Sequence, residues 1–273
     1  MPDLTIDTNL ARNILTSFIK TEINRSGFER VVLGLSGGLD SALACYLAVE
    51  ALGPTNVLAI RMPYKTSSAE SLEHAQLVID ALNVTNLTIP ITDMVDPLIS
   101  RFPEMGNRRK GNIMARQRMI ILFDQSEEFK GLVLGTGNKT EILLGYSTLY
   151  GDSACALNPI GDLYKTQVRQ LARDMGVPQE LIDKAPSADL WKGQTDEGEL
   201  GFTYEEVDKL LYLLIDQRYK PEECVEAGFP VDFVKQVLKR VQRNQYKRVL
   251  PPIAKLSNRT VGYDFLYLRD WGT

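Results

Sequence analysis

The residues best suited to chemistry form the glycine-rich stretch GLSGGLDS, residues 34–41. It follows an apolar run at 31–33 and leads into an Ala- and Leu-rich segment at 42–49, which predicts strand, loop and helix. Gly37 and Gly38 let the backbone approach a ligand closely, and the first N–H groups of the helix favour a phosphate. Asp40 would repel that phosphate unless a divalent cation lay between them. The stretch therefore predicts a nucleotide phosphate site that also holds Mg²⁺.

A second motif, GTGNKTE at residues 135–141, follows the apolar residues 132–134 and supplies another acid, Glu141. Mg²⁺ usually takes one or two protein carboxylates and completes its shell with phosphate and water. We therefore predict that Asp40 and Glu141 hold one metal ion. The first loop lacks the lysine of a Walker motif. The plainer alternatives are a helix-end carboxylate for Asp40 and a solvated helix residue for Glu141.

The elements around these motifs alternate between strand and helix. Helices are expected at 8–26, 42–49, 67–82 and 107–124, and strands at 30–33, 56–62, 87–91 and 132–134. This order predicts an α/β fold with a doubly wound parallel sheet, whose loops after the first, second and fourth strands meet at one edge. From about residue 164 the pattern is helical. We expect residues 1–273 to form one domain, and the glycine- and acid-rich segment 187–201 to be a mobile loop or lid that excludes water.

Composition narrows the class of protein. The chain has 273 residues, 44% of them hydrophobic and 24% charged, with a formal net charge of −4. This composition is typical of a globular protein and weakens the case for a nucleic-acid partner. Its three cysteines are far apart and it has a single histidine, so neither a disulfide framework nor a zinc site is predicted. No apolar run of about 18 residues and no signal peptide is present. We expect a cytoplasmic protein without a membrane partner.

The SGGLDS loop resembles the pyrophosphate-binding loop of the ATP pyrophosphatases, which transfer AMP from ATP to a substrate oxygen. With five further motifs in order, the chain is similar to the NAD synthetases from about residue 10 to its end. These motifs are KGNIMARQRM (110–119), GTGNKTE (135–141), GYSTLYGD (145–152), NPIGDLYKTQV (158–168) and PSADLWKGQTDEGELG (186–201).

The resemblance implies a carbon–nitrogen ligase that amidates nicotinic acid adenine dinucleotide (deamido-NAD) with ammonia, through an acyl adenylate, and releases AMP and pyrophosphate. Mg²⁺ is the implied cofactor and ATP the co-substrate. Asp152, which would attract and deprotonate ammonium, and Lys165, which would stabilise the departing pyrophosphate, are the implied catalytic residues. The dinucleotide contacts would be Arg116, Tyr246 and Lys247. The ATP contacts would be Gly34, Leu35, Ser36, Gly37, Gly38, Leu39, Asp40, Ser41, Thr136, Lys165 and Ser187.

The chain departs from many ammonia-dependent members at Leu149, Ala156 and Tyr246, where they carry lysine, aspartate and histidine. Its TLYGD motif (148–152) is similar to the corresponding stretch in the synthetase domain of glutamine-dependent members. The N-terminal amidase domain of those members is not expected here. Ammonia would then be free or come from a separate subunit, and the family implies a homodimer. Two alternatives are another SGGxDS enzyme, of the GMP-synthetase-like or tRNA-modifying kind, and a nucleotide-binding sensor without catalysis.

Overall fold

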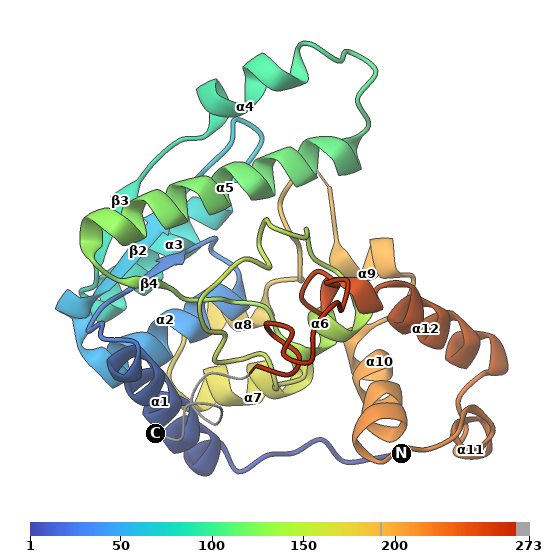
Figure 1. Cartoon of the computed structure of the whole chain (residues 1–273). Helices are drawn as coiled ribbons and strands as arrows, with labels where there is room; N and C mark the ends of the chain where they lie inside the picture. The colour runs from blue at the N-terminus through green and yellow to red at the C-terminus, as the bar shows by residue number, and fades with distance from the viewer. Residues whose placement is uncertain (192, 266–273) are drawn as a thin grey trace.

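The sheet at the centre of the molecule has four parallel strands. In the computed structural model, which describes residues 1–191 and 193–265, these strands are β1 (Val31–Gly34), β2 (Val57–Arg61), β3 (Thr85–Thr88) and β4 (Leu132–Val133). Their spatial order is β3-β2-β1-β4 (Figure 1). The chain thus moves outward from β1 to β3 and then returns to the other side of β1. Ligands bind at such a reversal in α/β sheets, beyond the carboxyl ends of the strands.

The third strand differs from the prediction. The apolar residues at 87–91 predicted a strand there, but the paired residues are Thr85–Thr88, opposite Leu58–Arg61. All four are exposed, because β3 lies at the edge of the sheet. The apolar pattern was misleading because the following residues continue along β2 without ladder pairing: the N–H of Ile89 donates to the carbonyl of Arg61 at 2.9 Å.

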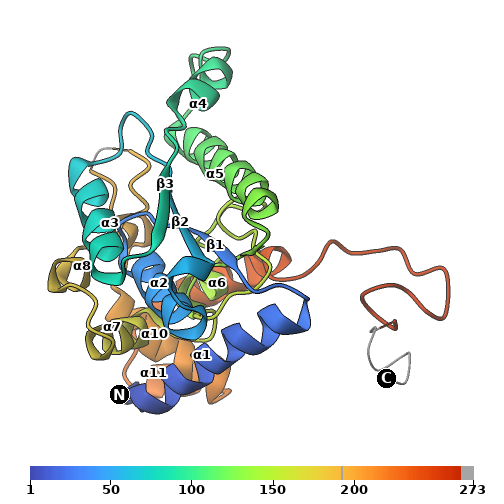
Figure 2. The same ribbon diagram turned by 90° about the vertical axis from the view of Figure 1, so that its left-hand side faces the viewer.

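Helices cover both faces of the sheet, as predicted for a doubly wound fold. The face that carries Val31 and Leu33 packs in one apolar cluster with α1 (Thr8–Arg25), α2 (Leu39–Leu52), α3 (Ala69–Leu82), α7 (Lys165–Asp174) and α8 (Gln179–Asp183). Val32 points the other way and joins a second cluster with α4 (Thr92–Ile99) and α5 (Asn107–Phe129), which lie across the sheet from α2 in Figure 2. Successive strand residues face opposite sides of a sheet, so β1 contributes to both cores.

The C-terminal half is helical, as expected, and has an apolar cluster of its own. Its elements are α6 (Lys139–Leu144), α9 (Asp196–Leu200), α10 (Tyr204–Leu211), a π-helical turn (Tyr212–Asp216), α11 (Pro221–Glu226) and α12 (Val231–Arg243). Two 3-10 turns, Pro54–Asn56 and Gln245–Lys247, complete the assignment. Tyr204 and Val207 are fully buried at the centre of this cluster. Whether 1–273 is one domain stays a prediction, and residues 266–273 lie outside the described part.

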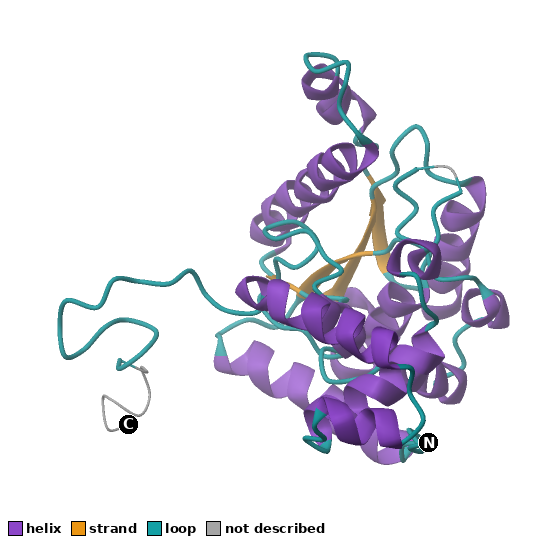
Figure 3. Ribbon diagram, turned by 90° about the vertical axis from the view of Figure 1, so that its right-hand side faces the viewer, coloured by secondary structure: helices purple, strands orange, loops and turns teal. Residues whose placement is uncertain are grey.

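Beyond the 3-10 turn Gln245–Lys247 the chain leaves the body of the molecule as an extended segment, visible in Figure 3. Among the described residues, none of the helices has both the length and the apolar character needed to cross a membrane.

Candidate active site

The loop after β1 is held in a compact turn by its own hydroxyl groups. The Oγ atoms of Ser36 and Ser41 lie 3.0 Å apart, and Ser41 Oγ also donates to the carbonyl of Gly38 at 2.9 Å. Gly37 has a φ of +77°, and a Cβ added there would lie 2.0 Å from the carbonyl oxygen of Ser71. Only glycine fits this position, which explains why the turn can pack directly against α3.

Three charged side chains meet beside this loop. Lys165, with 5% of its side chain exposed, forms an ion pair with Asp40. Asn138 connects the two acids, since its Nδ2 donates to Asp40 Oδ1 at 3.0 Å and its backbone N–H donates to Glu141 Oε2 at 3.2 Å. The structure thus brings together Asp40, Glu141 and Lys165, although they come from α2, α6 and α7.

The electrostatics of this group are dominated by its burial. Burial and then the charge of Asp40 raise the pKa of Glu141 well above its ordinary value. Burial alone would lower the pKa of Lys165, but the carboxylates of Asp40 and Glu141 outweigh that effect and raise it. A bound cation would favour the ionised form of Glu141, whose ionisation burial and the charge of Asp40 oppose.

The acid-rich segment predicted as a mobile loop or lid lies against the site in its described residues, 187–191 and 193–201. Asp196 is 4% exposed and accepts hydrogen bonds from the hydroxyls of Tyr146 and Tyr204 at 3.1 and 3.2 Å. Asp189 accepts from the backbone N–H of Ser68 at 3.0 Å and so connects the segment to α3. Ser187, a predicted ATP contact, donates to the carbonyl of Gln194 at 2.8 Å. Lys192 lies outside the described residues.

A cavity of about 1230 Å³ opens next to this group. The ends of β1, β2 and β4 all reach it through Ser36, Met62 and Thr136, which confirms that these loops converge. A smaller cavity of about 190 Å³ adjoins it and is lined by Asp40, Glu141 and Lys165 among others. Thr136 and Asp152 line both.

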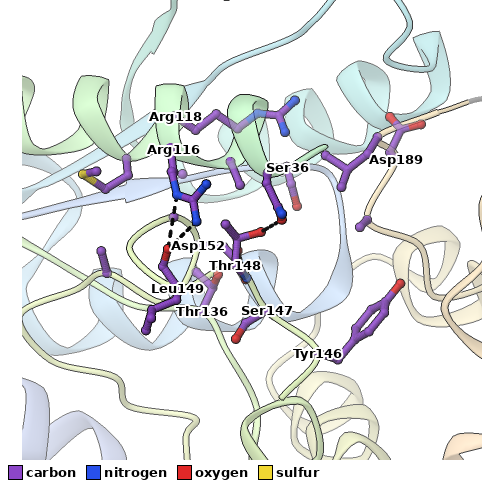
Figure 4. A pocket seen from close by; sticks show the side chains of 18 of the residues that line it. Ser36, Arg116, Arg118, Thr136, Tyr146, Ser147, Thr148, Leu149, Asp152 and Asp189 are labelled. Carbon is purple, nitrogen blue, oxygen red and sulfur yellow. Dashed lines mark hydrogen bonds between the residues drawn. The ribbon is translucent and has the colours of Figure 1, made fainter. Parts of the chain in front are cut away.

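The predicted dinucleotide contacts all line the larger cavity, but their side chains differ in exposure and in hydrogen bonding. Tyr246 is 59% exposed. Arg116 donates from Nε and Nη2 to the carbonyl of Leu149 at 3.3 and 3.2 Å, as Figure 4 shows. Lys247 is directed at the main chain, where its Nζ donates to the carbonyls of Gly145 and Ser147 at 2.7 and 2.6 Å. It therefore supports the loop after α6.

Asp152 faces the cavity (Figure 4). Its carboxylate accepts a hydrogen bond from the backbone N–H of Thr148 at 2.8 Å. The residue is exposed to the cavity, yet neighbouring protein displaces part of the water around its carboxyl, and this desolvation raises its pKa. A carboxylate in such a position is suited to accept a proton.

The sequence analysis did not single out Arg118, which lines the cavity, or Asp196, which is buried beside it. Arg118 lines the cavity and donates from Nε to the carbonyl of Met62 at 3.0 Å. A signal was present, because Ala115, Arg118 and Leu122 share one helix face and all line the cavity. Nothing in the sequence distinguishes Asp196 from its acidic neighbours, since its burial depends on two tyrosines from other segments.

The residues present fit a magnesium ion bound together with a nucleotide. Asp40 and Glu141 supply two carboxylates beside the loop at 36–41, and the pKa of Glu141 is raised by burial and then by the charge of Asp40. Within the described ranges, no three or more His, Cys, Asp or Glu side chains are grouped to hold a metal by themselves. Phosphate and water would have to complete the shell, which is the usual arrangement for Mg²⁺.

The parallel sheet, the loop after β1 and the flanking helices define an α/β protein of the ATP pyrophosphatase fold. Comparison with known proteins narrows this class. The family model for NAD synthase matches residues 11–251, and the chain belongs to that family. This confirms the resemblance inferred from the motifs.

The similar proteins agree with the family. The chain is 58% identical over 272 residues to the NH(3)-dependent NAD(+) synthetase of Trichlorobacter lovleyi, with 100% of both chains covered. The NH3-dependent NAD synthetase of Campylobacter jejuni, solved in complex with nitrate, aligns with a TM-score of 0.78 and 34% identity, over 92% of this chain and 100% of that one. The NMN synthetase of Francisella tularensis aligns with a TM-score of 0.82 and 31% identity, over the same shares.

Proposed function

We propose that this protein joins ammonia to the carboxylate of deamido-NAD, with ATP as co-substrate, and forms NAD, AMP and pyrophosphate. The observation that carries this proposal is the meeting of Asp40, Glu141 and Lys165 beside the phosphate loop, at the edge of a cavity of about 1230 Å³. Common small-molecule sites measure roughly 300–1000 Å³, so this space is larger than a typical site for one small ligand.

In the first half-reaction, an oxygen of the nicotinate carboxylate attacks the α-phosphorus of ATP. The bond from that phosphorus to the bridging oxygen breaks, and pyrophosphate leaves with its electron pair. The N–H groups of the loop at 36–41 and the ammonium of Lys165 stabilise the charge that grows on the leaving group. Asp40 and Glu141 would hold Mg²⁺, which neutralises phosphate charge when bound. The carboxylate thereby becomes an acyl adenylate with a good leaving group.

In the second half-reaction, ammonia attacks the acyl carbon and AMP leaves. Ammonia is mostly protonated at neutral pH, so a carboxylate that attracts the cation and takes its proton would increase the rate. Asp152 is the residue we assign to this step, because it faces the cavity and partial desolvation raises its pKa. We expect D152N to raise the KM for ammonium about tenfold or more while pyrophosphate release from the first step continues. D124N, on the exposed side of α5, is the matched control.

The structural similarity to an NMN synthetase favours a second candidate substrate, the mononucleotide of nicotinic acid. The two candidates differ only in the adenylyl half, since the reacting carboxylate is the same. The identity of 58% with a relative named as an NAD synthetase leads us to prefer the dinucleotide.

The decisive assay supplies ATP, Mg²⁺ and either deamido-NAD or nicotinic acid mononucleotide, with ammonium or glutamine as nitrogen donor. We expect NAD and AMP in equal amounts from deamido-NAD with ammonium, and no ADP. ADP as product, faster turnover of the mononucleotide, or ready use of glutamine by the pure chain would contradict the proposal.

We further infer that the enzyme is a homodimer in the cytoplasm, and that its ammonia is free or comes from a separate subunit. Support for a dimer comes from apolar side chains left exposed on two helices, such as Leu10 and Ile14 on α1, each 56% exposed, and Ile120 on α5, 54% exposed. Light scattering during gel filtration measures the mass of the particle, and a monomer would contradict the inference.

A further inference from the structure

A carboxylate outside both cavities connects the two helices that carry the metal-site groups. Asp208 lies on α10, is 0% exposed, and lines neither the large nor the small cavity. It therefore cannot touch a substrate. A fully buried acid needs hydrogen-bond partners, because an unpaired buried charge is costly.

Its partners come from the first turns of α6 and α7. The hydroxyl of Thr140 donates to Asp208 Oδ1 at 2.6 Å, and the backbone N–H of Thr166 donates to Asp208 Oδ2 at 2.9 Å. The same Thr140 oxygen accepts from the backbone N–H of Lys165 at 3.0 Å. Two N–H groups at the start of α7 are thus satisfied by one carboxylate and one hydroxyl from other helices, where intrahelical partners are lacking.

Along the chain, these contacts lie one residue away from Glu141 and Lys165. Thr140 precedes Glu141, and Thr166 follows Lys165. We propose that Asp208 is a positioning residue that fixes the first turns of α6 and α7 relative to each other, and so sets the spacing of Glu141 and Lys165. The inference rests on the proposed function, because it assigns those two groups to the binding of MgATP.

An aspartate is needed here because both of its oxygens accept. An asparagine in the same place keeps one acceptor, and its NH₂ group must face either the Thr140 hydroxyl or the Thr166 N–H. Turned toward Thr166 it opposes donor to donor, and turned toward Thr140 it forces that hydroxyl to reorganise. Either arrangement disturbs α6 or α7 at its first turn.

The test compares D208N and a matched pair at Thr140. T140V keeps the shape of the side chain but removes the hydroxyl, whereas T140S keeps the hydroxyl and removes a methyl group. E205Q, an exposed residue on the same helix, controls for the loss of one negative charge. ATP binding is measured by calorimetry with and without Mg²⁺, beside steady-state kinetics and urea unfolding.

We expect D208N and T140V to weaken magnesium-dependent ATP binding about 10- to 100-fold, the range for residues that orient metal ligands, with the KM for deamido-NAD unchanged. T140S should recover most of the binding, and E205Q should match the wild type. Equal binding by T140S and T140V, or weaker binding explained by the unfolded fraction alone, would overturn the proposal.

If D208N does not fold, the Thr140 pair still decides the question. The binding measurement also separates this inference from the proposed function. A wild-type protein that makes no NAD, but whose variants differ in MgATP binding as stated, would refute the reaction and support the positioning role of Asp208.

Discussion

The contact between the loop at 36–41 and α3 can be tested at Gly37. G37A adds one methyl group at a φ of +77°, where it would lie 2.0 Å from the carbonyl oxygen of Ser71. Gly176, just after α7, provides a matched control, because its φ is +74° and nothing lies within 4 Å of an added Cβ. The two substitutions share the backbone strain and differ only in the steric clash.

The expected magnitudes follow from this difference. A non-glycine residue in the left-handed region costs about 1–2 kcal/mol, which is the whole expected effect of G176A. In G37A the Cβ and the Ser71 oxygen must also separate by about 1.4 Å to reach the 3.4 Å of ordinary contact. Overpacking of this kind adds about 1–3 kcal/mol, so the expected loss of unfolding free energy is about 2–5 kcal/mol.

The clash also predicts a loss of function at Gly37 alone. Any shift of the loop moves the N–H groups that we propose to bind the phosphates, so G37A should weaken ATP binding at least tenfold, or about 1.4 kcal/mol, and G176A should not. Urea unfolding and calorimetric titration with MgATP measure the two effects. A G37A protein as stable as G176A that binds ATP normally would show that the loop can move away from α3 without cost.

Three further predictions follow from the charged groups and the thiols. K165M removes the buried partner of Asp40 and should lower the free energy of unfolding by about 3–5 kcal/mol. The loss in the double variant D40N/K165M should be smaller than the sum of the losses in D40N and K165M. Additive losses would contradict the ion pair. Because the pKa of Glu141 is raised by burial and by Asp40, magnesium-dependent ATP binding should decline as pH falls through that raised value, with a midpoint that moves lower as Mg²⁺ increases. The raised pKa also makes the free energy of unfolding depend on pH. The stability that Glu141 contributes is fully present below its pKa in the unfolded chain and is lost as the pH rises through its pKa in the folded protein. E141Q should remove the pH dependence of both ATP binding and stability. Burial raises the pKa of Cys45 to about 12, whereas Cys155 is only half-buried. Alkylation of the native protein should therefore modify Cys155 first and spare Cys45 until urea unfolds the chain. Peptide mass mapping measures which cysteine is modified.

The sheet and its first loop were predictable because they depend on local patterns. A buried β-branched run, a pair of glycines and an Ala-rich helix determine the turn at 34–41 within one short stretch. The helical C-terminal half followed from helical spacing in the same way. The edge strand β3 was predicted a few residues late, because exposed threonines carry no apolar signal.

The same distinction between local pattern and tertiary packing applies to the site. The sequence by itself indicated which acids are suited to a metal and which loop is suited to phosphate, since glycine geometry and carboxylate chemistry belong to the residues themselves. Only the tertiary structure decided that Lys165 reaches Asp40 across 125 positions of the chain, that Lys247 is tied to main-chain carbonyls, and that Asp196 and Asp208 are buried. The reason is physical: a side chain's partners are set by how distant helices pack, and helical spacing identifies an apolar face without naming what covers it.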